Sequence, residues 1–162
     1  DMKRFVPSLI FLSIVSITGC INAPNFSDTP EIEFISFSKS TLVQGDINND
    51  STFMTIEFTD GDGDIGTSAT GTELNMFIID NRNGAEYDKI KLPEIPKEGA
   101  NNGVKGSITV KLFNGCCLFD DKPNCTVVPS ETNQITFDVY IIDNAGNQSN
   151  TITTTPLSLI CS

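Results

Sequence analysis

The chain has 162 residues, with 21 acidic against 10 basic side chains, a formal net charge of −11 and no histidine. Binding to nucleic acid or to an anionic membrane face depends on basic side chains, so we expect neither kind of partner. The missing histidine removes the usual general base and the imidazole metal ligand, which favours a protein that is not an enzyme. The acidic excess instead suits the binding of divalent cations.

The first twenty residues have the pattern of a targeting segment. Met2-Lys3-Arg4 is a short basic region, and residues 5–17 are mainly apolar, a run too short for an ordinary transmembrane helix. Ile17-Thr18-Gly19-Cys20 resembles the lipobox of bacterial lipoprotein precursors, which are cleaved before the cysteine that then carries the lipid. The resemblance implies a signal peptide over 1–19 and a membrane anchor on Cys20. The alternative is a secretory peptide with an incidental cysteine.

Residues 20–31 are expected to form a flexible tether, because they contain two prolines and two asparagines with little apolar surface to bury. Removal of 1–19 leaves 20 acidic against 8 basic residues, a net charge of about −12. The part that remains is long enough for one domain with its own core, which we place at 32–162.

Within this domain, short runs rich in Ile, Val, Phe and Thr are separated by clusters of Gly, Asn, Asp and Pro, which predicts strands and turns. The expected strands are 33–39, 52–59, 73–80, 86–92, 106–113, 134–143 and 151–159. Seven strands of this kind are typical of an all-β, antiparallel two-sheet sandwich. Turns are expected at 80–84 and 143–147, and a long loop at 94–105.

An acidic, glycine-rich loop follows the second expected strand, with Asp60, Asp62 and Asp64 at every second position. Ca²⁺ requires hard oxygen ligands, six to eight of them at roughly 2.3–2.6 Å, on a backbone that can turn sharply. The loop departs from the EF-hand pattern, because its glycine comes one residue late and no Glu stands at the twelfth position. A calcium site is the first interpretation, and an acidic surface turn that binds nothing is the alternative.

Four cysteines remain once Cys20 is lipidated, and an even number in an exported domain predicts two disulfides. Cys116 and Cys117 are adjacent, so on a strand they point to opposite faces and pair with different partners. Cys117–Cys125 with Cys116–Cys161 is one pairing, and the exchanged pairing is the other. A structural zinc site is disfavoured by the spacing and by the absence of histidine.

The segment 137–150, with the turn Asp143-Asn144-Ala145-Gly146-Asn147, resembles the last hairpin of bacterial immunoglobulin-like domains. Together with the lipobox and the acidic loop, it makes the chain similar to small surface lipoproteins of Bacteroidota. The resemblance implies an immunoglobulin-like sandwich that is lipid-anchored to the outer membrane and faces the cell surface, with the periplasmic face as the alternative. Asp50-Ser51-Thr52 also resembles the O-glycosylation acceptor of these bacteria, which implies modification of Ser51.

In an immunoglobulin-like sandwich, the loops after the second and sixth strands lie at the same end. Asp143 and Asn144 of the later loop are therefore expected to join Asp60, Asp62 and Asp64 around Ca²⁺. Without a cation, the carboxylates of this cluster would repel one another, and this repulsion would raise some of their pKa values. A bound cation removes the repulsion.

The first expected function is that of a non-catalytic interaction or accessory subunit of an outer-membrane protein assembly. A calcium-dependent glycan-binding module at the cell surface is the alternative. Sugar-binding modules usually present exposed aromatic side chains, whereas this chain has no Trp and only two Tyr. Tyr140, in the middle of a strand, is expected to pack in the core or to make a corner hydrogen bond, and most of the Phe residues are expected in the core.

Overall fold

The computed structural model describes residues 25–45, 49–95 and 103–162, so the expected signal peptide, Cys20 and residues 21–24 of the tether lie outside the described residues. The described chain forms ten strands. These are β1 (Glu31–Phe37), β2 (Thr41–Val43), β3 (Ser51–Asp60), β4 (Met76–Asp80), β5 (Ala85–Ile90), β6 (Val104–Phe113), β7 (Thr132–Ile135), β8 (Phe137–Ile141), β9 (Ile152–Thr153) and β10 (Leu157–Ile160). The described residues include no helix long and apolar enough to cross a lipid bilayer.

Every strand expected from the sequence is present, so the all-β prediction is confirmed. Two of the seven are each divided: the expected strand 134–143 is β7 and β8, and 151–159 is β9 and β10. Pro156 lies between β9 and β10, where it has no amide proton for a ladder bond. The short strand β2 was not predicted, because three residues carry too little pattern.

The strands hydrogen-bond into three sheets, of order β1-β3-β6, β5-β4-β8-β9 and β2-β10-β7. All pairs are antiparallel except β2 with β10, which is parallel. The prediction of two purely antiparallel sheets is therefore wrong in detail. One long layer is divided into two sheets, because the chain is interrupted between β7 and β8 and again between β9 and β10. The short strand β2 pairs with β10 at the edge of the smaller sheet.

Inward-facing side chains of the sheets form one core. Along β3 the buried positions alternate with outward ones and are Thr52, Met54, Ile56, Phe58 and Asp60. Met54, Ile56 and Phe58 pack in the same cluster as the buried apolar side chains of β4 and β8. Phe53 points outward with 48% of its surface exposed, so it is not one of the Phe residues that form the core.

Of the two cysteine pairings left open by the sequence, the structure forms Cys116–Cys125 and Cys117–Cys161. The other pairing is wrong. Cys117 and Cys161 are both fully buried, so their bond is made inside the core, whereas Cys125, the partner of Cys116, is exposed. The adjacent cysteines thus pair with different partners, as expected, but they follow β6 instead of lying on a strand.

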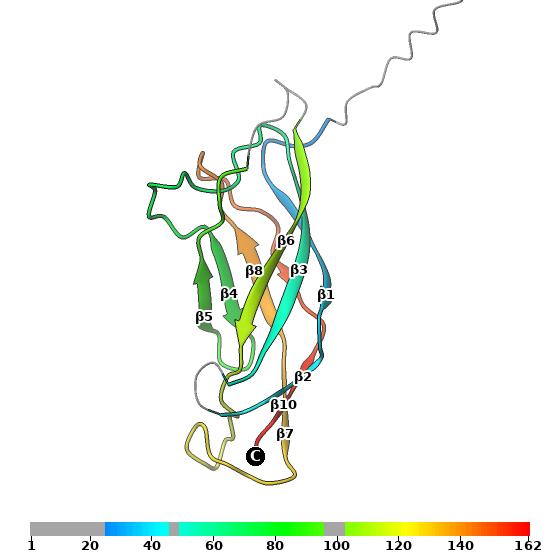
Figure 1. Ribbon diagram of the computed structural model, residues 1–162, viewed down its shortest axis with the longest axis vertical. Coiled ribbons are helices and arrows are strands. Elements are labelled where there is room, and N and C mark those ends of the chain that lie inside the picture. Colours follow the sequence, from blue (N-terminus) through cyan, green and yellow to red (C-terminus); the bar gives the residue numbers. More distant parts are fainter. Residues whose placement is uncertain (1–24, 46–48, 96–102) are drawn as a thin grey trace, which may run out of the picture.

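The two ends of the molecule are different. In Figure 1 the first described residues, the end of β3 and the loop that follows β8 lie at the upper end, and β7, β10 and the C-terminus lie at the lower end. The disulfides belong to the lower end, because they join the segment after β6 to the chain that flanks β7 and β10.

Candidate metal centre

The acidic loop continues directly from β3, and the strand's alternation determines where its first carboxylate points. Asp60 occupies the fifth inward-facing position of β3 and is fully buried. Gly63 and Gly66 follow with φ of 67° and 94°, a left-handed conformation that glycine adopts without steric cost. Gly63, between Asp62 and Asp64, allows the loop to turn so that the carboxylate of Asp64 lies near those of Asp60 and Asp62.

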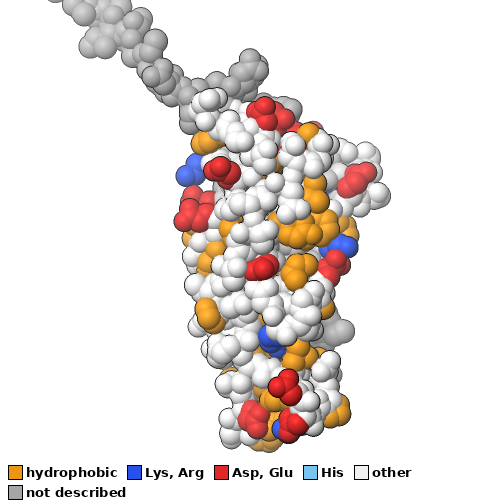
Figure 2. Space-filling view, turned by 180° about the vertical axis from the view of Figure 1, so that it is seen from behind, with side chains coloured by type: hydrophobic (Ala, Val, Ile, Leu, Met, Phe, Trp, Pro, Cys, Tyr) orange, Lys and Arg blue, Asp and Glu red, His pale blue; other side chains and the backbone are white. Residues whose placement is uncertain are grey.

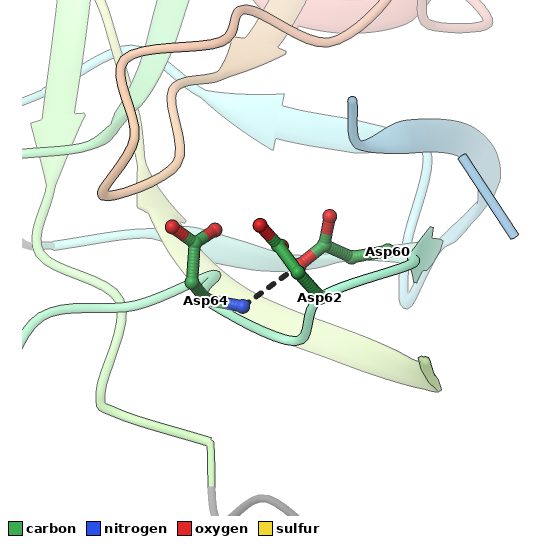
Figure 3. A group of neighbouring side chains, drawn as sticks. All are labelled: Asp60, Asp62 and Asp64. Carbon is green, nitrogen blue, oxygen red and sulfur yellow. Dashed lines mark hydrogen bonds between the residues drawn. The ribbon is translucent and has the colours of Figure 1, made fainter. Parts of the chain in front are cut away.

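The three carboxylates form one group. One oxygen from each of Asp60, Asp62 and Asp64 lies within 4.8 Å of the others, and Figure 3 shows the three side chains projecting from the same side of the loop. Asp62 is exposed and Asp64 is half-buried, so the group opens from the end of the core to solvent. A cation could enter from the Asp62 side.

Two oxygens of the group are buried without a hydrogen-bond partner. The Oδ2 atom of Asp60 accepts a hydrogen bond from the backbone amide of Asp64 at 2.9 Å, the contact drawn in Figure 3. Its Oδ1 atom, and the Oδ1 atom of Asp64, accept none. A buried polar atom without a hydrogen-bond partner is costly in free energy. Each of these two oxygens is therefore a position where a cation or a hydrogen-bond donor would bind favourably.

Burial is the main reason why these carboxyl groups are hard to ionise. The pKa of Asp60 is raised to about 6, mainly by burial and also by the charges of Asp62, Asp64 and Asp143, against the hydrogen bond from the Asp64 amide, which lowers it. The pKa of Asp64 is raised for the same reasons, burial first and then the charges of Asp143 and Asp62. None of the ion pairs among the described residues involves the group.

A second buried aspartate shows what the group lacks. Asp80 occupies the last inward-facing position of β4, as Asp60 does on β3, and is 4% exposed. Its carboxylate is paired with the guanidinium group of Arg82 at 2.6 Å. The fold therefore neutralises one strand-end aspartate with its own arginine, whereas at Asp60 the neighbouring charges are negative.

The loop after β8 meets the acidic loop, as predicted. The side-chain amide of Asn144 donates to the carbonyl oxygens of Asp64 and Gly66, at 2.7 Å each. The carboxylate of Asp143 accepts from the backbone and side-chain amides of Asn147, at 2.7 and 2.9 Å. Asp143 therefore lies beside the group without being one of its three members, and Asn144 serves as a clamp between the loops.

The residues fit a hard divalent cation. Three carboxylates supply oxygen ligands, the type that Ca²⁺ prefers, and one side of the group is open to water molecules that would complete six to eight ligands. The two unpaired buried oxygens provide places for such a cation. The sequence did not reveal the role of Asn144, since an asparagine in a turn is ordinary.

The other predicted sites have separate outcomes. Ser51 is half-buried at the start of β3, and its modification stays a prediction. The neighbouring carboxylate of Asp50 accepts from the backbone amides of Val43 and Ser51 and pairs with Lys39, a structural role that the sequence pattern did not indicate. Lipidation of Cys20 lies outside the described residues.

Tyr140 differs from its prediction. It faces outward from β8 and stacks on Phe77 of β4, with ring centroids 4.8 Å apart and planes 9° from parallel. The Lys89 ammonium group lies 5.4 Å from the Phe77 ring. Figure 2 shows hydrophobic side chains gathered at mid-height on this side of the molecule. The expectation of a core position is wrong, because the alternation of β8 buries Phe137, Val139 and Ile141 instead.

Comparison of the chain with protein-family models, with curated proteins and with solved structures finds no match.

Proposed function

We propose that the protein is a non-catalytic, calcium-binding interaction module, anchored to the outer membrane by lipid on Cys20 and acting as an accessory subunit of an outer-membrane protein assembly. The observation that carries the calcium part is the fully buried Asp60 carboxylate, whose Oδ1 atom has no partner in a group of three carboxylates. Asp60, Asp62 and Asp64 are the ligands, Asp143 adds negative charge beside them, and Asn144 holds the two loops together.

The strand order supports an immunoglobulin-like sandwich. If β1, β3 and β6 are strands A, B and E of such a domain, then β5, β4, β8 and β9 are C′, C, F and G in the opposite sheet. The connection from β1 to β2 crosses from the first sheet to the edge of β10. Domains of this architecture serve mainly as binding and spacing modules, so the assignment favours a non-catalytic role by fold analogy alone.

Calorimetric titration of the domain with Ca²⁺ tests the site. Binding of one ion is expected, together with a higher midpoint of thermal unfolding that EGTA reverses, because a ligand that binds only the folded state stabilises it. Asp62→Asn removes an exposed ligand and should abolish both effects. Asp120→Asn, also an exposed aspartate, is the matched control and should change neither. A wild-type domain without any heat of binding would contradict the site.

Purification of the native lipidated protein in mild detergent tests the assembly. Mass spectrometry should identify an outer-membrane barrel protein in stoichiometric amount. A protein that is recovered alone would contradict the role of accessory subunit and leave the calcium site unaffected.

The second candidate function is calcium-dependent glycan binding, and the outward-facing pair of Phe77 and Tyr140 is the observation that favours it. Aromatic rings on an outer sheet face are the usual contacts of sugar-binding modules, although here the two rings cover each other. Glycan-array binding that is lost both with chelator and in Tyr140→Ala would support this function. Binding that survives the Tyr140 substitution would contradict it.

A further inference from the structure

The segment that leads from the expected tether into β1 lies directly against the acidic loop. The backbone amide of Gly61 donates to the carbonyl oxygen of Ser27 at 2.7 Å. Pro30, the residue before β1, is buried. In Figure 1 this segment, drawn in blue, enters the sandwich at the end that carries the loop after β3.

The packing between the segment and the loop leaves no free space at Gly61. A Cβ atom at this position would lie 2.6 Å from the carbonyl oxygen of Phe26 and 2.7 Å from Oδ1 of Asp28. Gly61 is not among the glycines with positive φ, so its lack of a side chain serves this close approach and not its backbone conformation. On the other side, the ring of Phe26 packs against Gly103.

Gly61 stands between Asp60 and Asp62, so one stretch of three residues both contributes two proposed ligands and holds the incoming segment. The carboxylates of Asp60, Asp62 and Asp64 lie close enough to repel one another, and a bound divalent cation would offset that repulsion and fix the loop backbone. The position of the Gly61 amide, and with it the docking of the segment, then depends on the ion.

We propose that a divalent cation of the Ca²⁺ type, bound by Asp60, Asp62 and Asp64, controls whether Phe26–Thr29 is docked on the sandwich and so sets how far the domain stands from its anchor. This inference rests on the proposed cation site and adds a regulated junction to it. Release of four residues lengthens the free chain by up to roughly 13–14 Å, at about 3.3–3.6 Å per extended residue. Depletion of calcium therefore frees the domain to extend and reorient.

Chymotrypsin provides a local probe, because it cleaves after phenylalanine and Phe26 lies within the segment. The lipidated full chain in detergent micelles is digested briefly with Ca²⁺ or with EGTA, and cleavage of the Phe26–Ser27 bond is quantified by mass spectrometry. Calorimetry on the same sample measures Ca²⁺ binding separately. We expect Ca²⁺ to slow this cleavage at least tenfold.

Gly61→Ala is the uncoupling variant, since its methyl group displaces the segment while all three carboxylates remain. It should still bind Ca²⁺, but with an affinity weakened by about the factor by which Ca²⁺ slows cleavage of the wild type, because the coupling is reciprocal. It should show fast Phe26–Ser27 cleavage with and without the ion. Gly45→Ala is the matched control, because a Cβ there meets only ordinary contacts at 3.7 Å or more. It should keep the wild-type protection, and circular dichroism checks that both variants are folded.

The outcomes separate the two proposals. Calcium binding without any protection of the Phe26–Ser27 bond overturns the regulated junction and leaves the metal site in place. Protection that persists in Gly61→Ala also overturns it. An absence of calcium binding in the wild type overturns the metal site, and the junction with it.

Discussion

Asn144 donates from its side-chain amide to the backbone carbonyl oxygen of Asp64 at 2.7 Å, across 80 positions of sequence. The same amide also reaches the carbonyl oxygen of Gly66 at 2.7 Å. Both carbonyls belong to the acidic loop, so this one side chain joins the loop after β8 to the loop after β3.

Substitution of Asn144 should therefore weaken the calcium site without removing a carboxylate. Asn144→Ala loses two hydrogen bonds, and we expect it to destabilise the domain by about 1–2 kcal/mol. The Ca²⁺ dissociation constant should rise roughly tenfold, because the ion must then order a loosened loop. Denaturant unfolding and calorimetry measure the two effects. Asn124→Ala, at an exposed position, is the control; equal effects of both substitutions would contradict the clamp.

Neutralisation of Asp60 should have opposite effects with and without calcium. Asp60→Asn keeps the shape of the side chain and an oxygen for the Asp64 amide, and it removes a buried charge that the neighbouring carboxylates disfavour. We expect a Tm roughly 2–4 °C higher in EGTA and no further rise with Ca²⁺. Differential scanning calorimetry tests both parts. A lower Tm in EGTA would show that the Asp60 charge is already compensated in the ion-free protein.

Much of this site was predictable from local pattern. The alternation of β3 identifies the inward face, and carboxylates at 60, 62 and 64 continue its period of two into a loop whose glycines allow a turn. The expected sandwich also placed the loop after β8 at the same end. These features depend on residues close in sequence or on a general rule of the fold.

The remainder depends on contacts that no local pattern encodes. Nothing near Gly61 indicates that the carbonyl oxygen of Ser27 will approach it, and nothing near Cys117 indicates whether Cys125 or Cys161 will be its partner. Tyr140 is a different case. Alternation places Phe137, Val139 and Ile141 on one face of β8, so the outward position of Tyr140 could have been inferred from the sequence.

The two disulfides should contribute unequally to stability. Cys117–Cys161 spans 44 residues and Cys116–Cys125 spans 9. From the loop entropy of the unfolded chain, the first stabilises by about 4 kcal/mol and the second by roughly 2.5 kcal/mol. Paired Cys→Ser substitutions, followed by urea unfolding, measure both contributions. A larger loss on removal of Cys116–Cys125 would contradict this order, which burial of Cys117 and Cys161 also favours.

Alkaline pH should destabilise the domain through Tyr87. Its ring packs on Phe137 with centroids 4.7 Å apart, and its hydroxyl donates to the carbonyl oxygen of Phe113 at 2.5 Å. Burial raises the pKa of Tyr87 to about 12 from the ordinary value of 10. The folded state therefore holds this proton more tightly than the unfolded state, and the stabilisation is complete below pH 10 and lost as the pH rises toward 12.

The expected loss is about 1.4 kcal/mol per pH unit in that range, or roughly 3 kcal/mol in total. Urea unfolding at a series of pH values between 8 and 12 measures it, and phenolate absorbance follows the ionisation directly. Tyr87→Phe has no proton to lose and serves as the control, so its stability should fall less steeply over the same range. A phenolate signal from residue 87 that appears near pH 10 in the folded domain would contradict the burial of this hydroxyl.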